Sequence, residues 1–366
     1  MTAKAIRLMT IDADAHVIET ERTWDYVDPS DAQYRPVVVG PVAEGSKARF
    51  WMADGKIRDR ARIDERTEDV QTLAERTGRN FVAPREAKMM ENISARLQHM
   101  DETDVDIQVL HPTLFIRQVA DRPEADVVVC RSYNRWLAGI WAQSNNRLRW
   151  VAMPPLLDMK AAVKELEFAV ENGACAVGMR PIEGDRTLPD PYFHPLYDAA
   201  NELGVAVAVH IGNSNPYVER LLGGGLGGSA FPALRLMCAA AAHALILSEI
   251  PSKFPNIRWG FLESASMWVP AVVHDLRRRI RAGKGKEAPP DLFKDNHVYV
   301  ACQTDDDIPY VLNYTGEDNL VIGTDYGHND TASEIEALRN LRGQEGIAPQ
   351  VIDKILSHNP KALYGL

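Results

Sequence analysis

The sequence contains no apolar run that approaches the roughly 20 residues needed to cross a bilayer. It also shows no signal-peptide pattern, because Lys4 and Arg7 precede the first strand without an apolar core segment. Cysteine is scarce, with 4 residues spread along the chain and no Cys-x-x-Cys spacing. These absences exclude a disulfide framework and a zinc knuckle. We expect a cytoplasmic protein with buried free thiols and no membrane partner.

A surplus of positive charge is also missing. The 366-residue chain has 51 Asp and Glu against 41 Lys and Arg, which gives a formal net charge of −10. Such a balance argues against nucleic acid or an anionic membrane as the partner. The glycine-rich segment 223–228 lacks the Gly-Lys-Ser/Thr ending of a phosphate cradle, so we interpret it as a pocket loop. The expected partner is therefore a small-molecule substrate.

Short apolar stretches alternate with helical patterns along most of the chain. Together with the apolar run that leads into Ile11–Glu19, they predict eight strands and a parallel (β/α)8 TIM barrel, with residues 1–366 as one domain. The later strands are expected at 105–110, 148–153, 174–179, 205–209, 257–262, 298–302 and 320–323. The helices are expected at 96–103, 124–145, 159–171, 192–203, 232–250, 268–281, 306–314, 333–341 and 349–356.

Residues 21–94 form a segment too long for an ordinary connection, so we predict an insertion after the first strand. Within it, Phe50–Ile57 is typical of a hairpin, because Asp54-Gly55 favours a type I′ turn. Insertions at this position of a barrel shape the substrate pocket or cover it as a lid.

Polar side chains stand where the predicted strands end, and in a parallel barrel those ends meet on one face. Asp14 and His16 are two residues apart, so an extended backbone presents both on the same side. Carboxylate and imidazole ligands together suit Zn²⁺, Fe²⁺ or Mn²⁺. Each residue taken alone could equally cap a backbone group or form an ion pair. The candidate residues at strand ends are Asp14, His16, His111, Arg180, His210, Glu263 and Asp325.

Several longer motifs, in their order and spacing, resemble the amidohydrolase-related family. This is the branch of the amidohydrolase superfamily that includes aminocarboxymuconate-semialdehyde decarboxylase and hydroxybenzoate decarboxylases. The resemblance covers nearly the whole chain and implies a barrel of the metal-dependent hydrolase type. The motifs lie at residues 12–19, 100–113, 209–212, 261–263 with 268–270, 323–328 and 359–365.

The resemblance implies four metal ligands: Asp14, His16, His210 and Asp325. Two positions depart from the family pattern. Asp14 stands where the family often has the first histidine of a His-x-His pair, and Glu263 stands where the decarboxylases place an acid/base histidine. A carboxylate at Glu263 changes the charge and the working pKa, which puts decarboxylation by that route in doubt. The carboxylate of Asp14 makes iron and manganese suitable as well as zinc.

Glu19 and His328 raise the possibility of a second metal ion. Each lies three residues beyond a predicted ligand, His16 and Asp325 respectively. A few relatives with an Asp-x-His-x-x-Glu opening are oxygen-activating hydroxylases with dinuclear iron or iron–manganese centres. Alternatively, Glu19 pairs with an arginine of the insertion, and His328 binds substrate or orients a ligand.

The leading functional hypothesis is a metal-dependent hydrolase or decarboxylase-like lyase that acts on a small carboxylate- or carbonyl-bearing molecule. Zinc is the first choice of metal, with iron or manganese as alternatives, as one ion or two. Asp325 and Glu263 would move protons, while His111 and Arg180 would position the substrate. The alternatives are an O₂-activating monooxygenase with a mono- or dinuclear non-haem centre, and a helper subunit paired with a related catalytic chain. A homo-oligomer or such a hetero-oligomer is expected in either case.

Overall fold

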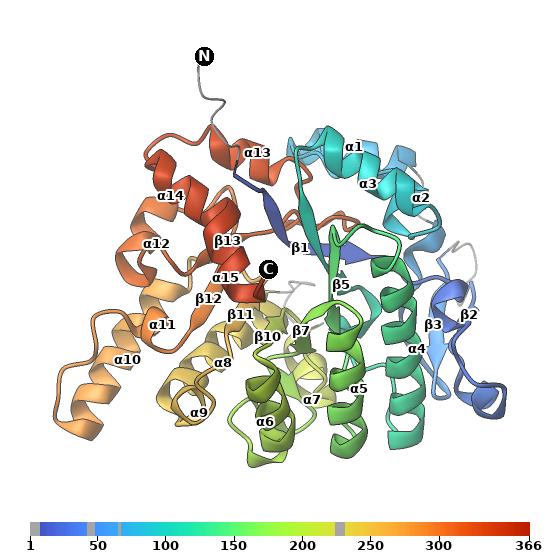
Figure 1. Cartoon of the computed structure of the whole chain (residues 1–366), viewed down its shortest axis with the longest axis horizontal. Coiled ribbons are helices and arrows are strands. Elements are labelled where there is room, and N and C mark those ends of the chain that lie inside the picture. The colour runs from blue at the N-terminus through green and yellow to red at the C-terminus, as the bar shows by residue number, and fades with distance from the viewer. Residues whose placement is uncertain (1–7, 42–47, 65–66, 224–230) are drawn as a thin grey trace.

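The computed structural model describes residues 8–41, 48–64, 67–223 and 231–366. Its main sheet has 8 parallel strands in the order β1-β5-β6-β7-β10-β11-β12-β13, which is also their order along the chain (Figure 1). The (β/α)8 barrel predicted from the sequence is confirmed. The strands are β1 Ile11–Val17, β5 Ile107–Pro112, β6 Leu148–Ala152, β7 Ala174–Met179, β10 Ala206–His210, β11 Trp259–Leu262, β12 Val298–Cys302 and β13 Leu320–Ile322.

The barrel closes between the first strand and the residues that follow β13. Ala15 forms a parallel bridge with Tyr326, and the amide of His16 donates to the carbonyl of Tyr326 at 2.8 Å. The amide of Asp325 donates to the carbonyl of Asp14 at 2.9 Å. Residues more than 300 positions apart are thereby joined at the end of the barrel where the polar strand ends gather.

Ten helices of the described chain surround the strands or cover an end of the barrel, and several follow from local signals. Asp158 caps α5 by accepting from the amide of Ala161, and Gly204 ends α6 in the left-handed conformation with φ 64°. These helices are α3 Ile93–Glu102, α4 Pro123–Trp141, α5 Met159–Glu171, α6 His194–Leu203, α8 Leu236–Leu247, α10 Val269–Lys284, α12 Ile308–Thr315, α13 Ala337–Arg342, α14 Pro349–Asp353 and α15 Asn359–Tyr364.

The helix expected at 232–250 is interrupted in the structure. The pattern at 232–250 predicted a single helix, but Phe231–Arg235 forms a π-helical turn and α8 ends at Leu247. Ser248 is extended, and the separate short helix α9 runs over Ile250–Lys253. The run is apolar on all sides, so its sequence pattern carries no period that marks where the helix ends.

Side chains of the last helix fill part of the barrel interior. Small side chains on the strands, such as Ala13, Ala176 and Ala208, line an inner cluster that also contains Leu363 and Tyr364 of α15. The Tyr364 hydroxyl donates to the carbonyl of Ala13 at 2.7 Å. Leu363 and Tyr364 therefore occupy interior space that larger strand residues fill in other barrels.

Residues 21–94 contain a small antiparallel sheet beside α4 (Figure 1). The hairpin turn has φ 50° at Asp54 and φ 72° at Gly55, as a type I′ turn requires. The Asp54 carboxylate accepts from the amides of Asp121 and Arg122, which tie the turn to the segment before α4. A lid function for this segment stays a prediction. Its elements are η1 Glu21–Trp24, η2 Pro29–Tyr34, β2 Val37–Val39, β3 Phe50–Ala53, β4 Lys56–Arg60, η3 Arg62–Asp64, α1 Thr67–Thr77 and α2 Arg85–Lys88.

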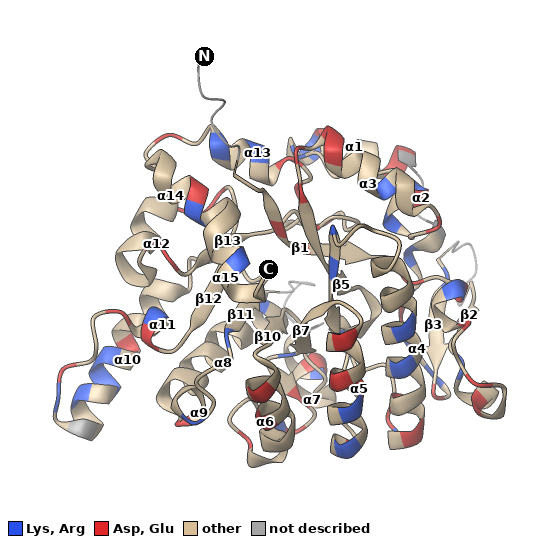
Figure 2. Cartoon of the chain, in the orientation of Figure 1, with Lys and Arg blue, Asp and Glu red and all other residues tan. Residues whose placement is uncertain are grey.

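Charged residues of both signs are spread along the outer helices, and basic residues gather on α10 (Figure 2). In the described residues, no helix has both the length and the apolar composition needed to cross a bilayer. All 4 cysteines are buried free thiols. Apart from Gly223, the glycine-rich segment that we interpreted as a pocket loop lies outside the described residues.

Candidate metal centre

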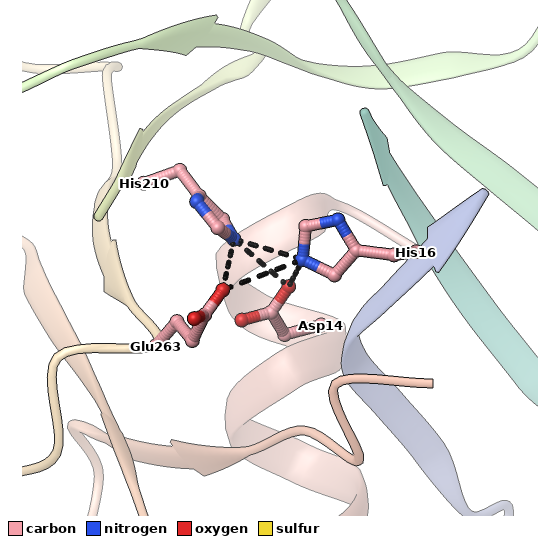
Figure 3. Close-up of side chains that lie close together, drawn as sticks. All are labelled: Asp14, His16, His210 and Glu263. Atoms are coloured by element: carbon pink, nitrogen blue, oxygen red, sulfur yellow. Dashed lines mark hydrogen bonds and ion pairs between the residues drawn. The ribbon is translucent and has the colours of Figure 1, made fainter. Parts of the chain in front are cut away.

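Four side chains from three strands point toward one another at the carboxyl ends of the barrel strands (Figure 3). Asp14 and His16 come from β1, His210 ends β10, and Glu263 follows β11 directly. His16 Nε2 lies 3.1 Å from His210 Nε2, 3.5 Å from Asp14 Oδ1 and 3.5 Å from Glu263 Oε2. His210 Nε2 lies 3.2 Å from Glu263 Oε2 and 3.4 Å from Asp14 Oδ1. These atoms surround one point at which a cation could bind.

A second group of ligand atoms shares His16 and Glu263 with the first and adds two residues from the segment after β13. Asp325 Oδ1 lies 3.3 Å from His16 Nε2 and 2.7 Å from His328 Nδ1. The rings of His16 and His328 stack with their centroids 3.9 Å apart. In each group the ligand atoms all lie within 4.8 Å of one another.

Hydrogen bonds to backbone carbonyls fix which ring nitrogens carry the protons. A carbonyl only accepts, so His16 Nδ1 donates to Pro112 at 2.9 Å and His210 Nδ1 donates to Ile211 at 3.1 Å. In the neutral rings, both Nε2 atoms then hold lone pairs that face each other. Hydrogen bonds from Nδ1 to a backbone carbonyl, like these two, orient histidine ligands in metal sites.

His328 is oriented in the same way from the opposite side. The Thr113 hydroxyl donates its proton to the Val17 carbonyl at 2.7 Å, so it accepts from His328 Nε2 at 2.9 Å. The Nδ1 lone pair of His328 therefore faces the carboxylate of Asp325. Two electron-rich atoms at 2.7 Å require a proton or a cation between them.

The unpartnered atoms of the cluster provide a test of whether these residues fit a metal ion. Asp14 Oδ1, Glu263 Oε2, Asp325 Oδ1 and His328 Nδ1 are all buried without a hydrogen-bond partner. Leaving one such atom buried and unpaired costs about 1–3 kcal/mol, and more for a charged one. Four of them directed into one space fit a divalent cation with nitrogen and oxygen ligands.

The electrostatics of the cluster also favour bound positive charge. Burial raises the pKa of both Glu263 and Asp325, and the negative charge of Glu263 raises that of Asp325 further. Although burial alone would lower it, the carboxylates of Asp14 and Glu263, each 3.5 Å from Nε2, raise the pKa of His16 to about 9. In the absence of a metal ion, the cluster therefore holds protons in place of a cation.

Glu19, one of the predicted ligands of a second metal, lies outside both groups. Its Oε1 accepts from the amide of Thr113 and its Oε2 from the amide of Leu114, each at 3.0 Å. These amides begin the short turn η4 Leu114–Ile116, so the carboxylate acts as a cap. Burial raises the pKa of Glu19 to about 7. Both oxygens are occupied, and the residue holds the loop that follows β5.

We predict that Glu19→Gln lowers the free energy of unfolding by about 1–3 kcal/mol and leaves the metal content unchanged. One of the two capping amides would face the new NH₂ group and lose its acceptor. Chemical denaturation measures the first effect and elemental analysis the second. Glu21→Gln, at an exposed residue nearby, is the control. A fall in metal content with Glu19→Gln alone would show that Glu19 is a ligand after all.

Arg180 and His111, the two predicted substrate-positioning residues, are differently placed. Arg180 donates to Glu183 at 2.6–2.9 Å and to the carbonyls of Phe115 and Arg117 at 2.9 and 2.8 Å. It is thus locked in an ion pair that joins the loops after β5 and β7. His111 lies beside the cluster, with Nε2 3.8 Å from Asp14 Oδ1, and burial lowers its pKa to about 3. Its ring is therefore neutral.

A buried polar network beneath the ligands was not identified from the sequence. Asp12 accepts from the amide and hydroxyl of Thr324 at 2.9 and 2.6 Å and from Gln108 at 3.0 Å. Gln108 in turn accepts from Arg96 at 2.6 Å, and Arg96 lies 3.5 Å from the ring centroid of Tyr326. The first aspartate of Asp12-Ala13-Asp14 was the available signal, but the register of β1 shifts between Asp12 and Ala15, so spacing alone did not show where Asp12 points.

Two cavities with shared wall residues lie on the His210 side of the cluster, and a third, of about 10 Å³, is lined by Asp14, Glu263 and Asp325. A narrow one of about 20 Å³ is lined by His111 and His210, and a larger one of about 260 Å³ lies beside it. The two share Phe115, Met153 and Arg180 as lining residues. The larger cavity has room for a small molecule, and the narrow one, with room for about one water molecule, lies between it and His210.

A closed parallel barrel with histidines and carboxylates at its strand ends defines the class of metal-dependent hydrolase barrels. Residues 11–366 match the model of the Amidohydrolase family, and the chain belongs to that family. The resemblance inferred from the motifs is confirmed.

Individual relatives are distant. The chain is 22% identical over 244 residues to a 2-amino-3-carboxymuconate-6-semialdehyde decarboxylase of Dictyostelium discoideum, covering 63% of this chain and 65% of that protein. An amidohydrolase from Mycobacterium avium subsp. paratuberculosis K-10 has TM-score 0.81 and 20% identity, with 99% of each chain covered. A dihydroxybenzoic acid decarboxylase from Polaromonas sp. JS666, solved with bound manganese and an inhibitor, has TM-score 0.62 and 20% identity over 81% of this chain and 93% of its own. The structural likenesses establish the fold.

Proposed function

We propose that this protein is a metal-dependent lyase or hydrolase that acts on a small carboxylate- or carbonyl-bearing molecule. The observation that carries the proposal is the set of unpartnered buried ligand atoms at the strand ends, beside a cavity. Decarboxylation is the first reaction to test, because two of the relatives are named as decarboxylases of carboxylate-bearing molecules.

Asp14, His16, His210 and Glu263 would hold the metal, with Asp325 and His328 at its side. A bound divalent cation supplies a Lewis acid that polarises a substrate oxygen or activates water. We favour zinc, and manganese or iron also suits two imidazoles with carboxylates.

Proton transfer falls to Asp325, which lies beside the metal-binding residues. The raised pKa of Asp325 allows it to keep a proton that it can donate, and Glu263 is its electrostatic partner. The Ser333 hydroxyl donates to Asp325 Oδ2 at 2.6 Å and orients the group. Arg180 keeps the loops around the entrance in place through Glu183, and the neutral ring of His111 forms one wall of the narrow cavity.

A second candidate function, an O₂-activating hydroxylase with two metals, rests on the second ligand group. One ring nitrogen binds one ion, so His16 serves a single metal and Glu263 would have to bridge the two. Only Asp325 and His328 then remain to complete the second site. Glu19, the further ligand predicted from the sequence, caps a loop instead.

We predict that the zinc- or manganese-loaded protein turns over an aromatic carboxylate substrate at the same rate with and without O₂. Released CO₂ would be measured for a panel of hydroxybenzoates and amino-substituted carboxylates under air and under argon, with hydrolysis of the corresponding amides followed in parallel. The control is the same protein after chelation, which should lose at least about 100-fold in rate. Turnover that requires O₂, together with two iron or manganese ions per chain, would instead establish the hydroxylase.

A further inference from the structure

The larger cavity contains a carboxylate that forms no ion pair with the described residues, although the charge of Arg180 acts on it at longer range. Asp126 of α4 lines it, with Oδ2 accepting from the amide of Leu157 at 3.1 Å and Oδ1 accepting weakly from the Cys130 thiol at 3.7 Å. In the described part of the chain, no lysine, arginine or histidine nitrogen lies within 4.0 Å of this carboxylate. A carboxylate has about four lone-pair sites, so Asp126 retains acceptor capacity toward the cavity.

The other charged residues of the cavity wall already have partners. Glu183 accepts from Arg180 with both oxygens and from the Ser214 hydroxyl at 3.1 Å. The exposed Arg186 places its guanidinium 4.3 Å from the ring centroid of Tyr192. Of the two carboxylates in the wall, Glu183 has an ion pair with Arg180, and Asp126 has none within 4.0 Å among the described residues.

Part of the remaining wall is apolar, and an interaction made with Asp126 beside that part is screened less than one at the surface. Phe115, Met153, Leu156 and Phe193 line the same cavity and are buried in the core of the protein. A charge-assisted hydrogen bond in such a setting is stronger than a neutral one and less screened than one at the surface. The cavity therefore suits a small molecule with a cationic end.

We infer that Asp126 binds a protonated amine of the substrate, at the end remote from the metal cluster. This inference rests on the proposed function, since it takes the larger cavity to be the substrate site. The shared residues Phe115, Met153 and Arg180 place the amine end in the larger cavity and the reacting end near His111 and His210. The substrate class is a small amine that also carries a carboxylate or carbonyl group.

The test is the binding of two probes of nearly equal size, benzylammonium chloride and benzyl alcohol, measured by calorimetric titration of the metal-loaded protein. We expect benzylammonium to bind more tightly, and Asp126→Asn to weaken it by about 10–100-fold, as the loss of a charge-assisted hydrogen bond implies. Benzyl alcohol should bind equally to both proteins. The control Glu124→Gln removes the same charge from an exposed position on α4 and should change neither affinity.

Equal affinities of the wild-type protein for the two probes, the same affinity for benzylammonium in Asp126→Asn, or no binding of benzylammonium would each overturn the inference. Unchanged melting temperature and metal content of Asp126→Asn verify that the variant folds and keeps its cluster. Because binding is measured without turnover, this result is separate from the test of activity. A protein that binds benzylammonium through Asp126 and releases no CO₂ would contradict the proposed reaction but not the amine site.

Discussion

Replacing His16 with alanine is expected to reduce the metal content of the purified protein from about one ion per chain to nearly none. The two ligand groups share two residues, His16 and Glu263. His16 Nε2 also lies within 3.5 Å of ligand atoms of Asp14, His210 and Asp325. Loss of an outer partner of a ligand already costs 10–100-fold in affinity, so loss of this ligand should cost at least about 100-fold. Catalytic activity should fall with the metal.

Elemental analysis of protein purified with zinc, manganese and iron present is the direct measurement. His358→Ala, at an exposed histidine far along the chain, is the matched control and should retain its metal. Metal retained by His16→Ala at the wild-type level would remove the basis for the proposed centre.

The same site should show a strong pH dependence of metal binding. The metal must displace the proton that Asp14 and Glu263 hold on His16, whose pKa is about 9 without metal. Affinity should therefore fall as the pH is lowered below this value, by about tenfold per unit while this proton is the one displaced. Titration of the metal-free protein at two pH values, with proton release followed in weak buffer, measures the effect.

The largest loss of stability is expected for Asp12→Ala. The carboxylate accepts from the amide and hydroxyl of Thr324 and from Gln108, and it joins β1 to the residues after β13 at the point where the barrel closes. Alanine would leave these buried donors without an acceptor. At about 1–3 kcal/mol for each unsatisfied group, the free energy of unfolding should fall by roughly 3 kcal/mol or more.

Chemical denaturation of the metal-loaded proteins measures this loss, with Asp295→Ala at an exposed aspartate as the control. Asp12→Asn keeps one acceptor oxygen, so its free energy of unfolding should lie between that of Asp12→Ala and that of the wild-type protein. Burial raises the pKa of Asp12 to about 6 from 3.8, so its folded form binds the proton more tightly than the unfolded chain. The stabilisation from this tighter proton binding is therefore full below pH 3.8 and is lost as the pH rises through 6. Both Asp12 variants should lack this pH dependence of the free energy of unfolding. Stability of Asp12→Ala equal to wild type would mean that the closure does not depend on this residue.

The barrel could be predicted from the sequence because its main signals are local. The strands at 174–179 and 298–302 are where the apolar runs placed them, since a strand buried on both faces is apolar throughout. The helix capped by Asp158 is also correct, because the cap and the helix are neighbours in the sequence. The helix predicted at 232–250 is wrong at its C-terminal end, where it stops at Leu247, because an all-apolar run contains no such local mark.

The candidate site could be predicted only in part. Residues at strand ends were brought together by the topology, so Asp14, His16, His210, Glu263 and Asp325 were identified from strand position. Glu19 could not be placed, because its role depends on which loop folds over it, and the loop at Thr113 is about 90 residues away in sequence. The ion pair of Arg180 and the charge of Asp126 likewise depend on contacts between separate loops.

The placement of Leu363 and Tyr364 inside the barrel has a consequence for the order in which the site assembles. Residues 359–366 are synthesised after every strand, yet they fill the space beneath β1 and hold the Ala13 carbonyl next to Asp14. Before residues 359–366 have packed, the eight strands would surround a space that no side chain of α15 fills. The ligands on β1 would then reach their final positions only after α15 has packed, so metal binding should follow the folding of this helix.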